Sequence, residues 1–245
     1  MANLAVLNKS PTYSVTLPAS KKTIKYRPYT VAEQKILLVA KEENTKQDIL
    51  NAIRTVVKDC TFGVIDINSI PTFETELLLL NIRSRAVSST IDMVMTCIDC
   101  DGQTDISIKV DDIKVVGDIK DDVSIKINDD LYVVMTYPTV LSSSTAASIT
   151  NDSPEQTSEE IFSASLDLML SCIKSIVSGD DVFETKDQTR EELVAFIDTL
   201  MESQINEMKT FIETCPTVMY RADHNCSKCA KVNDTYIGGL ENFFG

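Results

Sequence analysis

The sequence predicts an α+β fold, in which a helical domain accompanies a small antiparallel β region. Three observations support this prediction. Apolar residues recur every three or four positions in several segments and alternate at period two in others, and two Cys-x-x-Cys pairs are each flanked by strand-like residues. With 245 residues, 43% of them hydrophobic, the chain can bury a sizeable core in one or two domains.

The first part, residues 1–90, is expected to hold a β-hairpin and helices. Residues 13–17 and 23–27 alternate in polarity on either side of a Pro-Ala-Ser-Lys-Lys turn, which is typical of a hairpin. Thr30 and Glu33 then form a capping box, which predicts that a helix begins here. The apolar face of this helix is expected to consist of Ile36, Leu37, Val39 and Ala40.

Two more helices are predicted in this part. One runs from about Gln47 to Cys60 and should pack on the first helix, because its apolar residues recur at three and four positions. The other is opened by Pro71, which suits a first helical turn, and continues through about Ala86. Its segment 77–80 is four leucines, which predicts burial on more than one side, in the core rather than under a partner subunit.

The second part, residues 91–141, is expected to hold the first cysteine pair and one small antiparallel sheet. Four segments alternate or run apolar between turn-forming residues, namely 105–110, 114–116, 123–127 and 131–136.

The third part, residues 142–215, is expected to be a linker followed by helices. Residues 142–154 are low in large apolar residues, which places a subdomain boundary there. Capping boxes at Thr157 with Glu160 and Thr189 with Glu192 predict two helices, the second continuing through Ile212. The fourth part, residues 216–245, should hold the second cysteine pair and a tail whose two phenylalanines could contact a neighbour or its own ribbon.

The two cysteine pairs predict a structural zinc site with Cys97, Cys100, Cys226 and Cys229 as ligands. A two-residue spacer lets both thiolates of a knuckle face one ion. Residues 100–108 also align without gaps on residues 229–237, so the two knuckles match beyond their cysteines. The resulting fold is a discontinuous four-cysteine zinc ribbon that closes the β region. A disulfide or redox pair is the alternative chemistry, and His224 is a rival ligand.

The remaining cysteines are expected to be structural. Cys60 and Cys172 end apolar helical patterns, and Cys215 precedes a proline at a helix end. An odd cysteine count, no signal-peptide pattern and no apolar run long enough to span a membrane predict a soluble protein made in a reducing compartment.

Charge and composition argue against several function classes. A net charge of −14 opposes binding to nucleic acid or an anionic membrane surface. The acidic residues near the first knuckle are expected to form a solvated face, or alternatively a docking surface for a basic partner. With one histidine in the chain and no phosphate-binding glycine loop, no catalytic arrangement is evident. A zinc ion held by four thiolates also leaves no position for a reactive water. We therefore expect no enzymatic activity.

Two segments resemble the baseplate hub subunit family of T4-like contractile-tailed bacteriophages. Residues 26–40, which read YRPYTVAEQKILLVA, look like the opening signature of that family, although Ala-Glu-Gln at 32–34 departs from a more charged pattern. Residues 70–86, which read IPTFETELLLLNIRSRA, are similar to its second helix, and the first knuckle follows at the corresponding position. The resemblance covers roughly residues 20 to 110 and is thin beyond about residue 140.

The resemblance implies a structural or assembly protein of the baseplate hub. Its partners would be other hub and tail proteins in a hetero-oligomeric assembly, with no nucleic acid and no membrane. It would be located in the virion tail baseplate and, during assembly, in the host cytoplasm. The alternative is a zinc-ribbon regulatory or transcription-associated adaptor that acts through protein contacts. Whether the protein stays in the mature particle is left open by the sequence.

Overall fold

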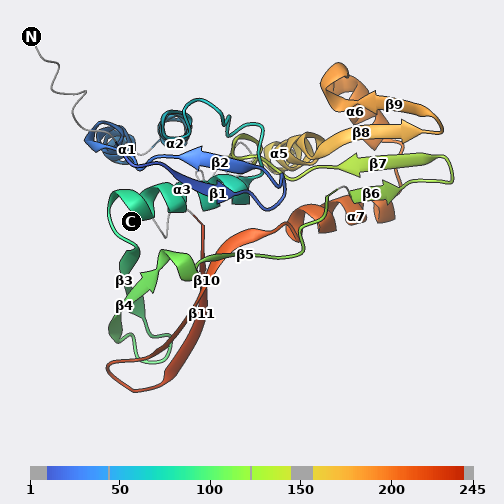
Figure 1. The fold of residues 1–245 in the computed structure, drawn as a ribbon. Helices are drawn as coiled ribbons and strands as arrows, with labels where there is room; N and C mark the ends of the chain where they lie inside the picture. The colour runs from blue at the N-terminus through green and yellow to red at the C-terminus, as the bar shows by residue number, and fades with distance from the viewer. Residues whose placement is uncertain (1–9, 44, 122, 145–156, 240–245) are drawn as a thin grey trace, which may run out of the picture. The chain divides into compact units, whose positions relative to one another are not determined.

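The computed structural model describes residues 10–43, 45–121, 123–144 and 157–239 (Figure 1). Helices and antiparallel sheets are combined, as predicted. The chain divides into two compact units: unit 1 comprises Met1–Asp66, Phe73–Val116 and Pro216–Gly245, and unit 2 comprises Ile67–Thr72 and Gly117–Cys215. The predicted four-part division stays a prediction. Most of its linker and most of the tail with the two phenylalanines lie outside the described residues.

Unit 1 begins with the predicted hairpin. Strands β1 (Tyr13–Thr16) and β2 (Thr23–Tyr26) pair antiparallel. The turn between them is held by Glu74, whose Oε1 accepts hydrogen bonds from the backbone N–H groups of Ala19 at 2.7 Å and Ser20 at 2.9 Å. Glu74 is fully buried. A carboxylate from a helix more than fifty residues later therefore fixes this hairpin turn.

The three helices of unit 1 begin and end close to the predicted positions. They are α1 (Val31–Glu43), α2 (Lys46–Cys60) and α3 (Thr72–Ala86). Thr45 caps α2 by accepting a hydrogen bond from the backbone N–H of Asp48. Helix α3 buries three of its four consecutive leucines, at positions 78 to 80, to 2% exposure or less. Burial on more than one side of α3 is therefore confirmed.

The predicted apolar face of α1 is wrong. Of its four residues, Ala40 alone is buried, whereas Ile36 and Val39 are exposed to 38% and 51%. The inward face instead carries Glu33, which is only 6% exposed. Its carboxylate accepts a hydrogen bond from the Arg27 guanidinium at 2.7 Å and another from the Thr30 backbone N–H. Because this ion pair occupies the inward side of α1, apolar residues are left on its outer side.

Two longer hairpins complete unit 1. The first consists of β3 (Thr90–Thr96) and β4 (Gln103–Lys109), and the second of β10 (Thr217–Asn225) and β11 (Val232–Gly238). Strand β5 (Lys114–Val116) pairs with the other edge of β10, which gives a sheet of order β11-β10-β5. The short 3₁₀ helix Val110–Asp112 separates β4 from β5.

The single sheet predicted between the cysteine pairs is therefore wrong. Its four strands are divided among three sheets, since β4 pairs with β3, β5 pairs with β10, and the other two belong to unit 2. In unit 2, β6 (Val123–Lys126), β7 (Leu131–Met135), β8 (Ile173–Ser178) and β9 (Asp181–Glu184) form an antiparallel sheet in that order. Local alternation predicted the strands, but the distant partners β10 of β5 and β8 of β7 placed them in different sheets.

The hairpin β8–β9 was not predicted, since helices were expected throughout this region. Helix α5 (Ser158–Ser171) ends before Ile173, and the tight turn at Gly179, with φ +58°, then joins the two strands. The capping boxes at Thr157 and Thr189 are confirmed. The second predicted helix is broken, however, into α6 (Arg190–Ile197) and α7 (Glu202–Glu213), and the 3₁₀ helix Thr185–Asp187 precedes it.

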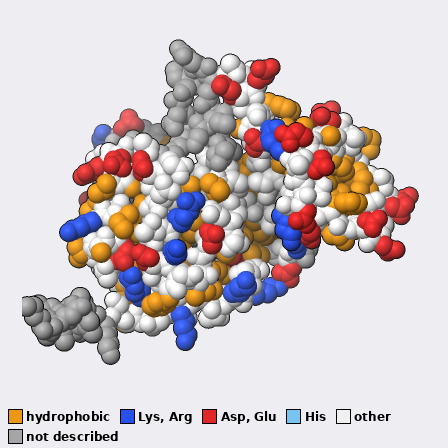
Figure 2. All heavy atoms as spheres, turned by 90° about the horizontal axis from the view of Figure 1, so that it is seen from above, with side chains coloured by type: hydrophobic (Ala, Val, Ile, Leu, Met, Phe, Trp, Pro, Cys, Tyr) orange, Lys and Arg blue, Asp and Glu red, His pale blue; other side chains and the backbone are white. Residues whose placement is uncertain are grey.

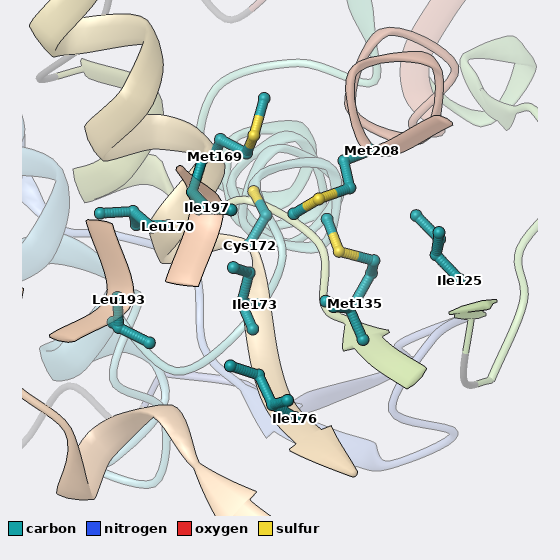
Figure 3. Close-up of a cluster of buried hydrophobic side chains, with 11 residues drawn as sticks. Ile125, Met135, Met169, Leu170, Cys172, Ile173, Ile176, Leu193, Ile197 and Met208 are labelled. Carbon is teal, nitrogen blue, oxygen red and sulfur yellow. The ribbon is translucent and has the colours of Figure 1, made fainter. Parts of the chain in front are cut away.

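The core of unit 2 lies between its sheet and its helices. Figure 3 shows side chains of Met135, Met208 and Cys172 directed toward one another between β7, α7 and the end of α5. Met169 and Met208 are buried in this core, whereas Met201 is 62% exposed. The cluster comprises Ile125, Val133, Met135, Met169, Leu170, Cys172, Ile173, Ile176, Leu193, Ile197 and Met208.

Within the described part of the chain, none of the helices combines the length and the apolar content that crossing a bilayer requires.

Candidate metal centre

Each of the two long hairpins of unit 1 carries one cysteine pair in the loop at its tip (Figure 1). In the first, Thr96 pairs with Gln103 and closes the loop 97–102. In the second, Asn225 pairs with Val232 and closes the loop 226–231. The two loops have the same length, and each begins with a cysteine. Residues 100–108 and 229–237, whose sequences align without gaps, therefore also occupy corresponding positions in their hairpins.

The two loops share their internal hydrogen bonds as well. The Cys97 N–H donates to the Gly102 carbonyl at 2.9 Å, and the Asp101 N–H donates to the Cys97 carbonyl at 3.0 Å. In the second loop, the Cys226 N–H donates to the carbonyl of residue 231, and the Ala230 N–H donates to the Cys226 carbonyl, both at 2.9 Å.

The residue that follows each second cysteine has a left-handed backbone. Asp101 has φ +54° and Ala230 has φ +59°. Side chains other than glycine seldom adopt this conformation, because Cβ comes close to the backbone. Its presence at corresponding positions reverses the chain tightly in both loops. Both thiols of each pair are thereby turned toward the facing hairpin.

The four thiols Cys97, Cys100, Cys226 and Cys229 meet in one cluster. The Sγ atoms of Cys97 and Cys229 are 3.9 Å apart, those of Cys100 and Cys226 are 3.6 Å apart, and all four lie within 4.8 Å of one another. A tetrahedral zinc ion with Zn–S bonds of about 2.3 Å places its ligands about 3.8 Å apart. The donor set and its spacing therefore fit zinc. A disulfide would require about 2.05 Å between sulfur atoms.

Backbone amides around the cluster favour thiolates at the first cysteine of each pair. N–H groups of Cys229 and Lys228 point at the Cys226 sulfur and lower its pKa to about 6, and those of Asp99 and Cys100 lower the pKa of Cys97. At Cys100 the N–H of Gly102 acts in the same direction, but the neighbouring thiols outweigh it and raise its pKa to about 12. A cation bound at the centre of the cluster would stabilise the thiolate form of all four residues.

Ser227 joins the two loops through hydrogen bonds that do not involve sulfur. Its backbone N–H donates to the Thr104 Oγ1 at 3.0 Å, and its hydroxyl donates to the Gln103 carbonyl at 2.7 Å. The second knuckle is therefore anchored on the first residues of β4.

Two lysines of the second loop also reach the first. The Lys231 ammonium forms an ion pair with Asp99 at 2.6 Å, and the Lys228 ammonium donates to the Cys100 carbonyl at 3.2 Å. Asp99 belongs to the acidic set that we expected to form a solvated face. Its partner on the facing loop gives it a local structural role instead.

Gly102 lies where the two loops are closest. A Cβ atom at this position would stand 2.7 Å from the Lys228 Cβ and 3.1 Å from the Sγ atoms of both Cys100 and Cys226. Any side chain would therefore intrude on the sulfur cluster. The corresponding residue of the second loop is Lys231, so this constraint applies to one loop alone.

The other candidate ligands lie elsewhere. His224, the rival ligand, is half-buried on β10 and is not among the four residues whose donor atoms cluster. The thiols of Cys60, Cys172 and Cys215 are also outside the cluster, and burial raises their pKa to about 12, 11 and 12. Neutral thiols of this kind, buried at Cys60 and Cys172 and half-buried at Cys215, fit the expected structural role.

The family to which the chain belongs is decided by a match over nearly its whole length. Residues 10–245 match the family described as T4 bacteriophage base plate protein. The chain belongs to this T4 baseplate family. The match includes both hairpins and the whole of unit 2, and so extends well beyond the two N-terminal segments that carry the sequence resemblance.

Membership of the T4 baseplate family indicates a structural protein of the phage baseplate, located in the virion tail and assembled with other tail or baseplate proteins. No curated protein and no solved structure shows significant similarity to the chain.

Sequence reasoning missed several residues of the site in this baseplate protein. Gly102, Ser227 and the ion pair between Asp99 and Lys231 matter because the two loops face each other, which local patterns do not show. One signal was available for Gly102. Glycine is rare in this chain, with seven in 245 residues, and one of them stands two positions after the first cysteine pair.

Proposed function

We propose that this protein is a structural or assembly component of the baseplate hub of a contractile-tailed phage and that a zinc ion staples its two ribbon hairpins. The observation that carries the baseplate role is the family match over residues 10–245. The finer assignment to the hub rests on the resemblance of residues 26–40 and 70–86 to hub subunits.

The zinc ion is proposed to be held by Cys97, Cys100, Cys226 and Cys229. The support is the closeness of the four sulfur atoms, all within 4.8 Å of one another, and the matched backbone of the two loops. With four protein ligands no coordination site remains for a reacting water, so the ion would stabilise the fold and not catalyse. The ion would link residues 91–141 to residues 216–245, which are the second and fourth parts of the predicted division.

Such a protein would act through protein–protein contacts at its surface, in the host cytoplasm during assembly and in the tail baseplate afterwards. A zinc-ribbon regulatory adaptor, the alternative expected from the sequence, requires the same metal site but has no further observation in its favour. The family match favours the baseplate.

A phage that carries a stop codon in this gene tests the hub role. Lysates of the mutant should contain baseplate wedges without complete tails, and electron micrographs should show no closed baseplates. Wild-type protein supplied from a plasmid should restore plaques. Complete tails in the absence of the protein would rule out a required role in hub construction. Mass spectrometry of purified particles would show whether the protein remains in the virion.

Complementation with cysteine variants tests the staple in the same phage. Cys97→Ser or Cys229→Ser should reduce plaque formation, because each removes one proposed ligand. Cys215→Ser is the matched control, since this thiol lies outside the cluster and contacts the Phe211 carbonyl. If both ligand variants complement fully, the zinc proposal is wrong, whereas the proposed baseplate role is unaffected.

A further inference from the structure

The outer side of helix α1 carries an exposed apolar stripe. Val31, Leu38 and Val39 are exposed to 67%, 53% and 51%. At about 100° of rotation per residue, these three side chains and those of Lys35 and Glu42 fall within about 100° of the helix circumference. The opposite side carries the buried Glu33 and Ala40. We call these five outer residues the α1 face. On the left of Figure 2, where α1 lies, hydrophobic side chains stand beside charged ones.

A shallow groove continues the α1 face toward α2. It has a volume of about 380 Å³ and is lined by Ile36, Val39 and Ala40 of α1 and by Ala52 and Thr55 of α2. Lys35, Glu43, Asp48 and Asn51 also line it, so its wall combines apolar and polar side chains. Apolar side chains gathered on one side of an exposed helix, beside such a groove, make this side the candidate interaction surface of unit 1.

The charges on the α1 face are arranged symmetrically about its apolar centre. Lys35 and Glu42 lie on either side of Leu38 and Val39, each about 5 Å from the midpoint along the helix axis. If two such helices cross antiparallel at this midpoint, Lys35 of each copy meets Glu42 of the other. A parallel arrangement would bring like charges together. The α1 face is thus complementary to itself under a two-fold rotation.

We propose that the α1 face is a homodimer interface, in which two copies of this chain pack their α1 helices antiparallel. Leu38 and Val39 of each copy meet their counterparts at the crossing point, and two Lys35–Glu42 ion pairs set the direction. This interface lies in unit 1 and does not depend on zinc. Because the contact is small and two copies with net charge −14 repel each other, we expect a dissociation constant on the order of 10 µM.

Sedimentation velocity of the full chain between about 1 and 200 µM tests this proposal, a range that brackets the expected constant. The wild type should shift from monomer to dimer across it. Leu38→Glu should weaken association at least tenfold, because it buries a charge at the centre of the interface. Val182→Glu is the matched control, since Val182 is 57% exposed on β9 in unit 2, and it should associate like the wild type.

A charge exchange tests the antiparallel direction. Lys35→Glu and Glu42→Lys should each weaken dimerisation severalfold, and the double variant K35E/E42K should restore it, because both ion pairs re-form with reversed signs. Circular dichroism would confirm that each variant is folded.

Three results would overturn the proposal. They are a wild type that stays monomeric throughout the range, self-association that Leu38→Glu leaves unchanged, and failure of the double variant to recover. Binding of another purified baseplate protein to a monomeric wild type, lost in Leu38→Glu, would assign the α1 face to that partner instead.

Discussion

Gly102 and Lys228 approach so closely that a Cβ atom on the glycine would stand 2.7 Å from the Cβ atom of the lysine. The same Cβ would stand 3.1 Å from two of the four clustered sulfur atoms. The contact joins a loop of the first hairpin to a loop of the second. Closure of the candidate zinc site therefore depends on the absence of a side chain as much as on the four cysteines.

Gly102→Ala should lower both the melting temperature and the affinity for zinc. The added methyl group pushes the loops apart, which costs about 1–3 kcal/mol in a tightly packed site. Thermal melts and competition with a chromophoric chelator would measure the two effects. Adding Lys228→Gly removes one of the clashing atoms, so the double variant should recover part of the loss. A Gly102→Ala protein with unchanged melting and zinc content would contradict this account of the contact.

Removal of zinc should release the two ribbon hairpins and leave unit 2 folded. When the ligands come from separate segments, as they do here, the free energy of metal binding contributes to the free energy of folding. We expect about one zinc per chain by elemental analysis. Treatment with a strong chelator should raise hydrogen exchange in residues 90–109 and 217–238, whereas exchange in residues 131–135 and 173–178 should stay unchanged. Purified protein without stoichiometric zinc would be evidence against the site.

Ala230→Gly should stabilise the second knuckle. Ala230 has φ +59°, and an alanine in the left-handed region costs about 1 kcal/mol relative to glycine. Glycine also adds freedom to the unfolded chain, so the net gain should stay below that value. Ala230→Val should destabilise instead, because a β-branched residue tolerates this backbone least. Urea denaturation of the zinc-loaded protein measures both changes, and a valine variant as stable as the wild type would argue against the left-handed turn.

Acid should weaken unit 1 through Glu33. Burial by itself would raise the pKa of this carboxyl, but hydrogen bonds from Arg27 and Thr30 outweigh it and lower the pKa from 4.5 to about 2. A lowered pKa in the folded state contributes stability that is present above pH 4.5 and lost as the pH falls toward 2. This contribution is on the order of 2 kcal/mol after allowance for solvent screening.

Glu33→Gln should therefore lower stability at neutral pH and flatten the acid limb of a stability profile between pH 4.5 and 2. Glu192→Gln is the matched control, because Glu192 occupies the same place in the Thr189 capping box but is exposed. Chemical denaturation at a series of pH values would compare the two variants. Equal losses of stability in the two variants would mean that burial of Glu33 beside Arg27 contributes no more stability than an exposed capping box does.

Local patterns predicted many of the elements of this protein but not all of their orientations. The capping boxes at Thr157 and Thr189 begin helices as expected, because a cap depends on residues three positions apart. The face that α1 buries was not predictable in this way. Its rotation depends on the ion pair between Glu33 and Arg27, which follows β2, so apolar residues that suggested a core face lie outside.

The cysteine spacing by itself determined which residues could share a metal ion, since a two-residue spacer and a matched sequence around it are local properties. The tertiary structure alone decided that the four sulfur atoms meet, which strands form which sheets, and that Gly102 must lack a side chain. The physical reason is that these features depend on contacts between segments that are separated along the chain, by more than a hundred residues at the sulfur cluster and by fewer between β7 and β8. Such contacts are set by packing of the whole unit and leave little trace in either segment.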